Sequence, residues 1–182
     1  MNPATDALLY AVNAIFFLLI TLMLLRVWMQ AARVNYYDQL VQFVVRITEP
    51  VVAPLRRVIP DLGKLNTAAL VWAWLLGVIE LMIILSLAGG GFDPISVSFF
   101  SLTGLVESMI SLAIWVVIGQ AILSWVSPQG NPIYNTLSQM TYPLMRPISR
   151  LIPPIGGFDI SPIFLIIALN MLRIVVSGFT VL

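Results

Sequence analysis

The chain has 182 residues, of which 60% are apolar and only 9% are charged, and its formal net charge is +1. Soluble domains carry about a quarter charged residues, so this composition indicates a membrane protein. The absence of cysteine and histidine excludes thiolate and imidazole chemistry at a metal or catalytic centre. Because HExxH, G-x-S-x-G and paired-aspartate motifs are also missing from the sequence, we expect neither an enzyme nor a cofactor or metal.

Four apolar runs predict an all-α protein with four membrane-spanning helices. About twenty apolar residues cover the hydrocarbon core of a bilayer. The first run has no basic segment before it and no cleavage site after it, so it is expected to be a retained span and not a signal peptide. The glycine-rich turn at 88–94 separates the two central runs, and residues 95–102 fit either an interfacial segment or an extension of the third span. The predicted spans are about 8–28, 67–87, 103–126 and 161–182.

The basic residues predict the orientation. All of them except Arg173 lie between the first and second runs or between the third and fourth. The positive-inside rule therefore places both of these basic segments in the cytoplasm and both termini outside.

The two basic segments belong to an internal repeat. "PVVAPLRRVIP" at 50–60 returns as "PLMRPISRLIP" at 143–153, an offset of 93, and upstream the offset becomes 97, which pairs Trp28 with Trp125. The sequence thus divides into two halves, 1–92 and 93–182, each predicted to run span, cytoplasmic segment, span in the same orientation. The motif comprises Pro50, Pro54, Pro60 and Gly63 in the first copy and Pro143, Pro147, Pro153 and Gly156 in the second, with Asn66 matched by Asp159.

Each cytoplasmic segment is predicted to begin with an amphipathic helix in the headgroup plane. In the first, Leu40, Phe43, Val44 and Ile47 share one face, opposite Gln39, Gln42 and Arg46. In the second, Asn131 suits the N-cap, Pro132 suits the first helical position, and Ile133, Leu137 and Met140 form the apolar face.

The prolines predict how each segment continues. Pro54 and Pro147 suit the start of a second short helix, which would end at Pro60 and Pro153. Gly63 and Gly156 then permit a left-handed turn. Asn66 in the first copy, and Asp159 or Ser161 in the second, are candidate caps of the following spans.

The sequences "LLRVWMQ", "QFVVRITEPVVAPLRRVIP" and "PLMRPISRLIPPIGGFDISPIFLI" closely resemble the YggT (YlmG) family of small bacterial and plastid membrane proteins, and the resemblance covers essentially the whole chain. It implies an integral protein of the bacterial inner membrane. Bacterial members are linked to hyperosmotic tolerance and potassium uptake, and related proteins to cell division or to assembly of plastid membrane complexes. The first copy has "GKLN" where the second has "GGFD", so an acid at this point belongs to the second copy alone.

Glu80, Glu107 and Arg173 lie well inside the predicted spans and need an explanation, because a charge at membrane depth is costly. Glu80 and Arg173 occupy equivalent positions at the offset of 93. They fit either a salt bridge that pins the two halves together or a proton or cation site at Glu80 poised by Arg173. Snorkelling to the interface and contact with another subunit remain further readings. Glu107, about one turn into the third span, is a candidate outer-side acid that reaches the interface.

Two functions follow as expectations. Ion homeostasis under osmotic stress, as a channel, transporter component or modulator, would require a homo-oligomer or a membrane-protein partner, because four helices fill their own core. The alternative is a non-transporting scaffold for cell-division or other membrane complexes. The expected partner in both cases is the bilayer, with no nucleic acid. Its anionic headgroups on the cytoplasmic side would contact the arginines of the repeat, which also serve to keep these segments inside, namely Arg56, Arg57, Arg146 and Arg150.

Overall fold

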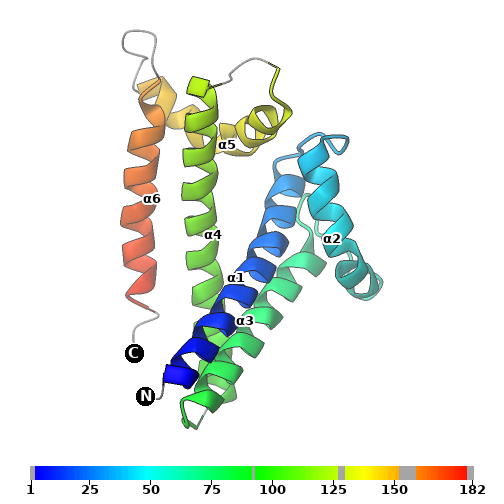
Figure 1. Cartoon of the computed structure of the whole chain (residues 1–182). Coiled ribbons are helices and arrows are strands. Elements are labelled where there is room, and N and C mark those ends of the chain that lie inside the picture. The colour runs from blue at the N-terminus through cyan, green and yellow to red at the C-terminus, as the bar shows by residue number, and fades with distance from the viewer. Residues whose placement is uncertain (1–2, 92, 127–129, 152–158, 180–182) are drawn as a thin grey trace.

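The structure is a computed structural model that describes residues 3–91, 93–126, 130–151 and 159–179. Within these ranges the chain forms helices and no named strand, as the sequence predicts. Figure 1 shows two antiparallel helix pairs side by side, with two further helices at one end of the molecule. The helices are α1 (Pro3–Ala31), α2 (Gln39–Arg56), α3 (Thr67–Leu87), α4 (Pro94–Val126), α5 (Pro132–Leu151) and α6 (Ser161–Ser177).

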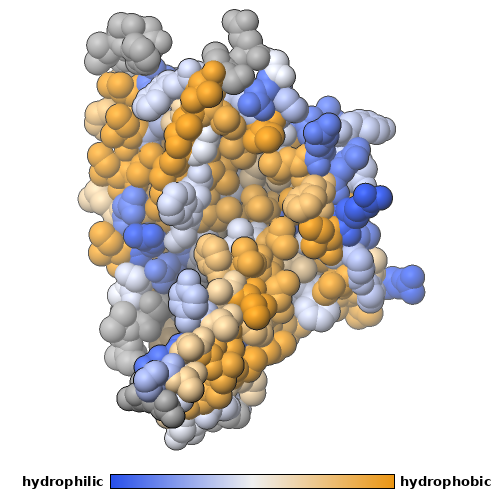
Figure 2. Space-filling model, in the orientation of Figure 1, coloured by the Kyte–Doolittle hydropathy of each residue, from blue (hydrophilic) through white to orange (hydrophobic). Residues whose placement is uncertain are grey.

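Three of these helices, α1, α3 and α4, are long and apolar enough to cross a membrane, and α6 is a shorter apolar helix. In Figure 2, apolar side chains cover most of the visible sides of α1, α4 and α6, whereas polar side chains gather over the outer side of α2. Water-soluble proteins bury such surfaces, so the exposed apolar helix sides indicate a membrane protein.

The two halves of the chain are built alike. α1 packs mainly on α3 and α4 mainly on α6, while α2 and α5 each pack on the two long helices of their own half. The halves meet where α4 packs on α3 and α1, and where α2 contacts α5. The same end of the bundle, which we call the basic end, holds α2, α5 and the C-terminal ends of α1 and α4; the start of α1 and the end of α6 lie at the other end (Figure 1).

Residues 95–102 extend the third apolar helix, since α4 begins at Pro94. Asp93 starts this extension: its Oδ2 accepts hydrogen bonds from the Ser96 backbone N–H and hydroxyl, both at 2.9 Å. These bonds lower the pKa of Asp93, and Pro94 suits the first helical position. The extension lies against α3, where the Ser101 hydroxyl donates to the Trp74 carbonyl at 3.1 Å.

Small residues let the long helices approach one another closely. Ala68, Ala69 and Ala73 on α3 are fully buried. A Cβ added at Gly77 would lie 2.7 Å from the Ser101 Oγ of α4. A side chain at Gly77 would therefore displace the Ser101 hydroxyl from its position between α3 and α4.

The prediction that Pro54 and Pro147 begin separate short helices is wrong. α2 continues through Pro50 and Pro54 to Arg56, and α5 continues through Pro143 and Pro147 to Leu151. All four prolines are exposed, so the carbonyl groups left without an N–H partner lie on the outer side of each helix, where water can hydrate them. The opposite side stays packed, and this packing offsets the cost of the prolines.

That packed side repeats between the halves at the offset of 93. The buried residues Val44, Thr48 and Val52 of α2 are matched in α5 by half-buried Leu137 and by Thr141 and Met145, which are buried. The apolar face predicted for each of these helices therefore has a buried part and an exposed part. Val44 and Met140 face the bundle, whereas Phe43, Ile47 and Ile133 are 60%, 44% and 46% exposed.

The predicted caps of α3 and α5 are confirmed, whereas the N-cap position of α6 is Ile160, whose side chain makes no capping bond. The Asn131 side chain accepts the Ile133 N–H at 3.0 Å, and α5 begins at Pro132. Asn66 accepts the Ala69 N–H at 2.9 Å at the start of α3. Asp159, and not Ser161, accepts at the start of α6, taking the Ser161 N–H at 2.9 Å.

The motif glycines and the closing prolines are only partly described. The chain has left α2 before Pro60, and Gly63 adopts the predicted left-handed conformation with φ +63°. Pro153 and Gly156 lie outside the described residues.

Candidate functional site

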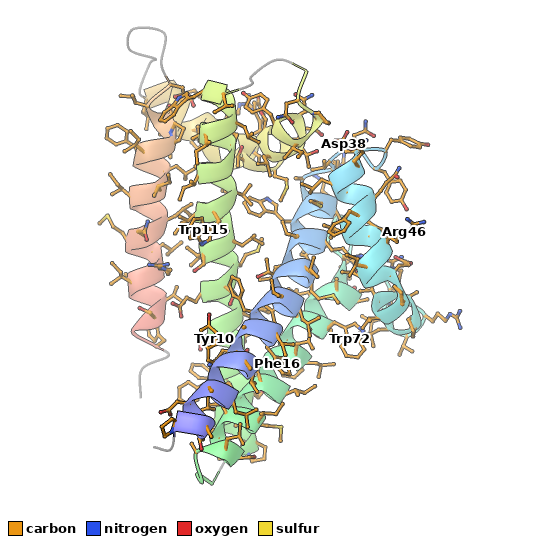
Figure 3. All side chains as sticks on the ribbon, in the orientation of Figure 1. Tyr10, Phe16, Asp38, Arg46, Trp72 and Trp115 are labelled. Carbon is orange, nitrogen blue, oxygen red and sulfur yellow. The ribbon has the colours of Figure 1, made fainter. Side chains whose placement is uncertain are left out.

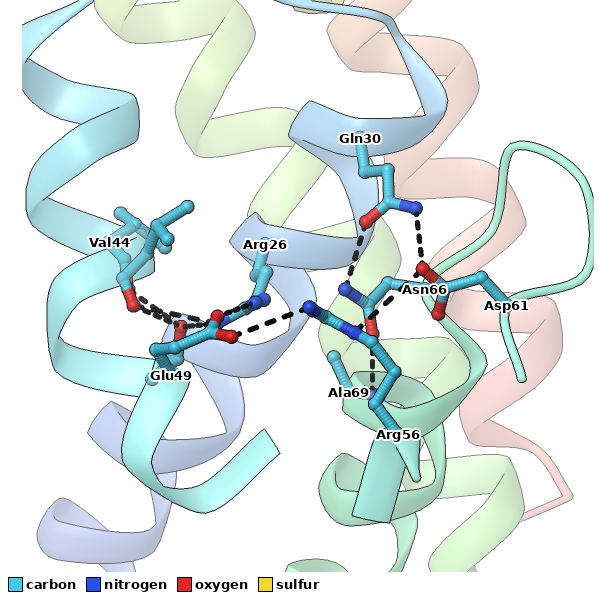
Figure 4. A network of polar contacts seen from close by, with 10 residues as sticks. Arg26, Gln30, Val44, Glu49, Arg56, Asp61, Asn66 and Ala69 are labelled. Carbon is cyan, nitrogen blue, oxygen red and sulfur yellow. Dashed lines mark hydrogen bonds and ion pairs between the residues drawn. The ribbon is translucent and has the colours of Figure 1, made fainter. Parts of the chain in front are cut away.

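A network of polar side chains joins α1, α2 and the start of α3 at the basic end (Figure 4). We call it the Arg26 network. Its members are Arg26, Gln30, Thr48, Glu49, Arg56, Asp61 and Asn66.

Arg26 is the centre of the network and is only 5% exposed. Its guanidinium donates to the Thr48 hydroxyl at 2.6 Å and forms an ion pair with Glu49. Thr48 in turn donates to the Val44 carbonyl of its own helix at 2.7 Å. The hydrogen bond from Arg26, together with the positive charges of Arg26 and Arg56, lowers the pKa of Glu49. The pair therefore stays ionised and holds α2 against the end of α1.

Arg56 extends the network from α2 to the segment before α3. Its Nη1 lies 3.4 Å from a Glu49 oxygen and its Nε 3.9 Å from Asp61 Oδ2. Gln30 donates to the same Asp61 oxygen at 3.2 Å and accepts from the Asn66 side chain at 2.9 Å. A continuous set of contacts thus connects the end of α1, the body of α2 and the cap of α3.

The second half docks its helices without charges. The Thr141 hydroxyl, equivalent to that of Thr48, donates to the Gln120 side-chain oxygen at 2.7 Å and so connects α5 to α4. At the repeat offsets, the charged members of the Arg26 network have neutral counterparts: Leu123, Tyr142, Ser149 and Pro154 in place of Arg26, Glu49, Arg56 and Asp61. The sequence prediction assigned Arg56 to headgroups and missed the network, although this charge difference between the copies is visible in the sequence.

A second polar site surrounds Glu80, within the apolar part of the bundle. A pocket of about 200 Å³ lies between α1, α3 and α4. Its polar lining comes from half-buried Glu80 with Asn13, Ser101 and Ser108, and Gly77 and Gly104 form part of its wall. Two hydroxyl side chains, an amide and a carboxylate therefore line a pocket whose other residues are apolar or glycine.

The structure does not bring Glu80 and Arg173 together. α3 packs on α1 and α4, and α6 packs on α4 and α5. Among the described residues the ion pairs are those of the Arg26 network, and Glu80, Glu107 and Arg173 take part in none of them. Glu107 and Arg173 are half-buried on α4 and α6, and neither lines the Glu80 pocket.

The remaining arginines of the repeat motif are exposed. Arg57 follows α2, and Arg146 and Arg150 lie on α5. The Arg146 guanidinium lies 5.9 Å from the centre of the Tyr142 ring. Arg46 also points outward, from the side of α2 (Figure 3).

Polar contacts also join the two halves at the basic end. The Thr136 hydroxyl of α5 donates to Asp38, just before α2, at 3.0 Å; Asp38 is labelled in Figure 3. The Asn35 backbone N–H donates to the Gln139 side chain at 3.3 Å. No group of three or more metal-ligating acids occurs in the part of the chain that the structure describes.

Comparison with known proteins places the chain in a family. The CCB3/YggT family model matches residues 5–87 and 99–180. An uncharacterised protein of the proC 3′ region of Vibrio alginolyticus is 37% identical over 167 residues, 91% of this chain and 90% of that protein. The uncharacterised protein YggT of Escherichia coli K12 is 37% identical over 172 residues, 94% and 90% of the two chains. The uncharacterised protein PA0392 of Pseudomonas aeruginosa is 35% identical over 180 residues, 97% and 89% of the two chains. No solved structure matches. The chain belongs to the CCB3/YggT family.

Proposed function

We propose that this chain is a four-span protein of the bacterial inner membrane that acts in cation homeostasis, as a channel, a transporter component or a modulator. The role that we propose is the one that the family resemblance implies, namely tolerance of osmotic stress through the control of potassium. The observation that carries the proposal is Glu80, an acid that lines a largely apolar pocket together with three other polar side chains and has no ion-pair partner among the described residues. Acids of this kind mark ion and proton pathways in membrane proteins.

The four-span topology is supported by α6. Its 17 residues make a helix about 25 Å long at 1.5 Å per residue, and it packs along α4. With α6 as a span, both termini lie on one side of the bilayer and the basic end on the other. The exposed arginines of that end, together with Phe43 and Ile47 of α2, suit a cytoplasmic interface with anionic headgroups.

Cysteine labelling tests this topology. The chain lacks cysteine, so single replacements Gly90→Cys, between α3 and α4, and Ser149→Cys, on α5, report on one position each. A Cβ added at Gly90 would make only ordinary van der Waals contacts, and Ser149 is exposed. We expect an impermeant thiol reagent added outside intact cells to label the cysteine at position 90 and to label position 149 only after permeabilisation. Labelling of both from one side would contradict the four-span topology.

Ion flux tests the functional proposal. Purified protein reconstituted into vesicles is expected to increase potassium or proton flux, measured with ion-sensitive dyes, above that of protein-free vesicles. Because four helices leave no open channel between them, we expect this flux to depend on a homo-oligomer or on a membrane-protein partner. Absence of flux from protein shown to be correctly oriented, both alone and with a co-purified partner, would count against a transport role.

The alternative function is a scaffold for cell-division or other membrane complexes, and one observation favours it. The outer side of the basic end presents exposed aromatic and apolar residues outside the long helices, with Tyr36 60%, Tyr37 82% and Phe43 60% exposed. A scaffold would use this surface and would not need Glu80. Loss of the osmotic phenotype on Tyr37→Ala, with full activity of Glu80→Gln, would favour the scaffold.

A further inference from the structure

A pocket separate from the Glu80 site lies at the basic end, between the end of α1 and the side of α2. Its volume is about 530 Å³, within the range of small-molecule sites. We call it the elbow pocket. The charged side chains in its lining are Arg26, Arg33, Glu49, Arg56 and Asp61.

The charges of the elbow pocket are incompletely matched. Glu49 is paired with Arg26 and Arg56, and Asp61 with Arg56, whereas Arg33 takes part in none of the ion pairs among the described residues. The lining therefore carries three positive and two negative charges. Two further groups lack a hydrogen-bond partner although their atoms are buried, the Arg56 Nε–H donor and the Asp61 Oδ1 acceptor. Buried polar atoms are normally satisfied. Arg56 and Asp61 both line the pocket, so a rotation of these side chains toward it would satisfy the two atoms on a ligand that brings both an anion and a donor.

Arg33 occupies a backbone position that favours glycine. It follows the end of α1 with φ +54°. The Arg33 N–H donates to the Gln30 carbonyl and the Val34 N–H to the Met29 carbonyl, both at 3.1 Å, which is the Schellman arrangement with arginine at its left-handed residue. At the repeat offset of 97 the second copy has Gly130, with φ +79°. The first copy thus has an arginine in a strained backbone conformation, and this arginine lines a charged pocket. The second copy has glycine at the equivalent position.

In the first half the Arg26–Glu49 pair helps to dock α2 on α1, but the fold does not by itself require charges at this contact. The equivalent contact in the second half joins Thr141 to Gln120 with no charged group. Arg33, which is in none of the ion pairs among the described residues, therefore has no part in this docking and is available to a ligand.

The depth of the pocket indicates its ligand. The charge-free apolar run at 7–25 ends directly before Arg26, and nineteen residues of helix span about 28 Å, close to the thickness of the hydrocarbon core. Arg26 then lies at the hydrocarbon boundary and Arg33 about 10 Å farther out, which is the level of the lipid headgroups.

We propose that the elbow pocket binds the headgroup of a single phospholipid: a phosphodiester held by Arg33 and Arg56, with an N–H or O–H donor of the same headgroup held by Asp61. Phosphatidylethanolamine and phosphatidylglycerol both carry such a donor, whereas phosphatidylcholine does not. The site differs from general attraction of exposed arginines to an anionic surface, because it needs the particular residues of one pocket. It requires that α1 spans the bilayer and does not depend on ion transport.

Calorimetric titration of the delipidated full chain in detergent with short-chain lipids tests the proposal. We expect saturable binding of phosphatidylethanolamine or phosphatidylglycerol, with phosphatidylcholine weaker by at least about fivefold because Asp61 Oδ1 stays unsatisfied. Inorganic phosphate and glycerophosphoethanolamine, which lack acyl chains, should bind at least about tenfold more weakly than the lipid. Equal affinity of a soluble phosphate and the lipid would reassign the site to a soluble ligand, and phosphatidylcholine binding as tightly as phosphatidylethanolamine would contradict the role of Asp61.

Two variants separate a binding role of Arg33 from a structural one. Arg33→Gly copies Gly130 of the second half, so it should leave the midpoint of thermal unfolding unchanged or raise it, while weakening lipid binding by about tenfold. Arg57→Gln removes the same charge from the exposed residue that follows α2 and does not line the pocket; it should change the affinity by less than about twofold. Equal weakening by both variants, or no saturable lipid binding by the unmodified protein, would overturn the proposal.

Discussion

Replacing Glu80 with glutamine is expected to reduce cation flux in reconstituted vesicles by at least about tenfold, because the amide keeps the shape of the side chain and removes its charge. Glu80 lines a pocket with Asn13, Ser101 and Ser108. The side-chain oxygen atoms of these three residues can bind a hydrated cation or a proton together with a carboxylate. They cannot supply the negative charge that attracts the cation or proton. The fold should survive the replacement, since Glu80 makes no ion pair within the described residues.

The matched control is Glu107→Gln. This replacement makes the same change of charge on α4, at a half-buried acid that does not line the Glu80 pocket, and should leave flux within about twofold of the original. Arg57→Ala and Arg150→Ala should also leave it intact, because both arginines are exposed at the basic end. Equal loss on Glu80→Gln and Glu107→Gln would show a general requirement for charge in the spans and would contradict a specific site.

Glu80→Gln, combined with Arg173→Gln, also tests the salt bridge between the halves that the sequence suggested. If Glu80 and Arg173 paired in the membrane, Glu80→Gln and Arg173→Gln would each lower thermal stability, and the double variant would lose no more than either alone. α3 and α6 both pack on α4 but share no extended contact with each other within the described residues, which predicts small and additive effects instead. A coupling between them of more than about 1 kcal/mol would show that the pair forms.

Features decided by neighbouring residues were predictable from the sequence. Asn131 and Asn66 cap helices because the acceptor side chain and the N–H groups that it binds lie within three residues of each other. The apolar run of α3, at Thr67–Leu87, was predicted with the bounds that the structure gives, since a polar cap and a glycine turn delimit it. The left-handed turn at Gly63 likewise depends on local backbone chemistry.

Features decided by packing were not predictable in this way. Local rules end a helix at proline, yet α2 runs through Pro54 because the opposite side of the helix, at Thr48 and Val52, is fully buried. The placement of Glu80 beside Asn13 and Ser101 depends on three helices at once, and the offset of 93 that pairs Glu80 with Arg173 says only that they occupy equivalent positions. Equivalent positions in a repeat need not be neighbours in space.

The second large effect is expected in the Arg26 network, where Glu49→Gln should destabilise the fold by about 2–3 kcal/mol. Breaking a fully buried ion pair costs about 3–5 kcal/mol, and the value here is smaller because the Glu49 side chain is 42% exposed. The cost arises at Arg26, which is 5% exposed and would lose its counter-ion, because the remaining partners are all neutral: the Thr48 hydroxyl, the Val45 carbonyl at 3.5 Å and the oxygen of the new amide. A buried guanidinium cannot lose its proton to escape the cost.

Replacing Arg26 and replacing Glu49 should therefore cost unequal amounts of stability. The difference between the two losses is the sharpest test of the network. Arg26→Leu, which copies Leu123 of the second half, should cost less than Glu49→Gln, because Glu49 can turn to water and to Arg56. Adding Arg26→Leu to Glu49→Gln should recover stability, since the double variant buries no unpaired charge. Thermal unfolding in detergent measures all three, with Glu107→Gln as a control expected to change little; a Glu49→Gln protein that is as stable as the original would contradict the pairing.

The pH dependence gives a second readout of the same pair. The pKa of Glu49 is lowered from its ordinary value of 4.5, so the unfolded chain binds the proton more tightly than the folded one. The stabilisation by the ionised carboxylate is therefore present above pH 4.5. It is lost as the pH falls through the lower pKa of the folded state. The stability difference between the original and Glu49→Gln should hence be largest near neutral pH and shrink below pH 4.5. Protonation of Glu49 and its replacement by glutamine both leave Arg26 buried without its counter-ion. Lowering the pH of the original protein should therefore mimic the substitution. A difference that grew as the pH fell would show that Glu49 is stabilised in its protonated form and that the ion pair does not hold α2 to α1.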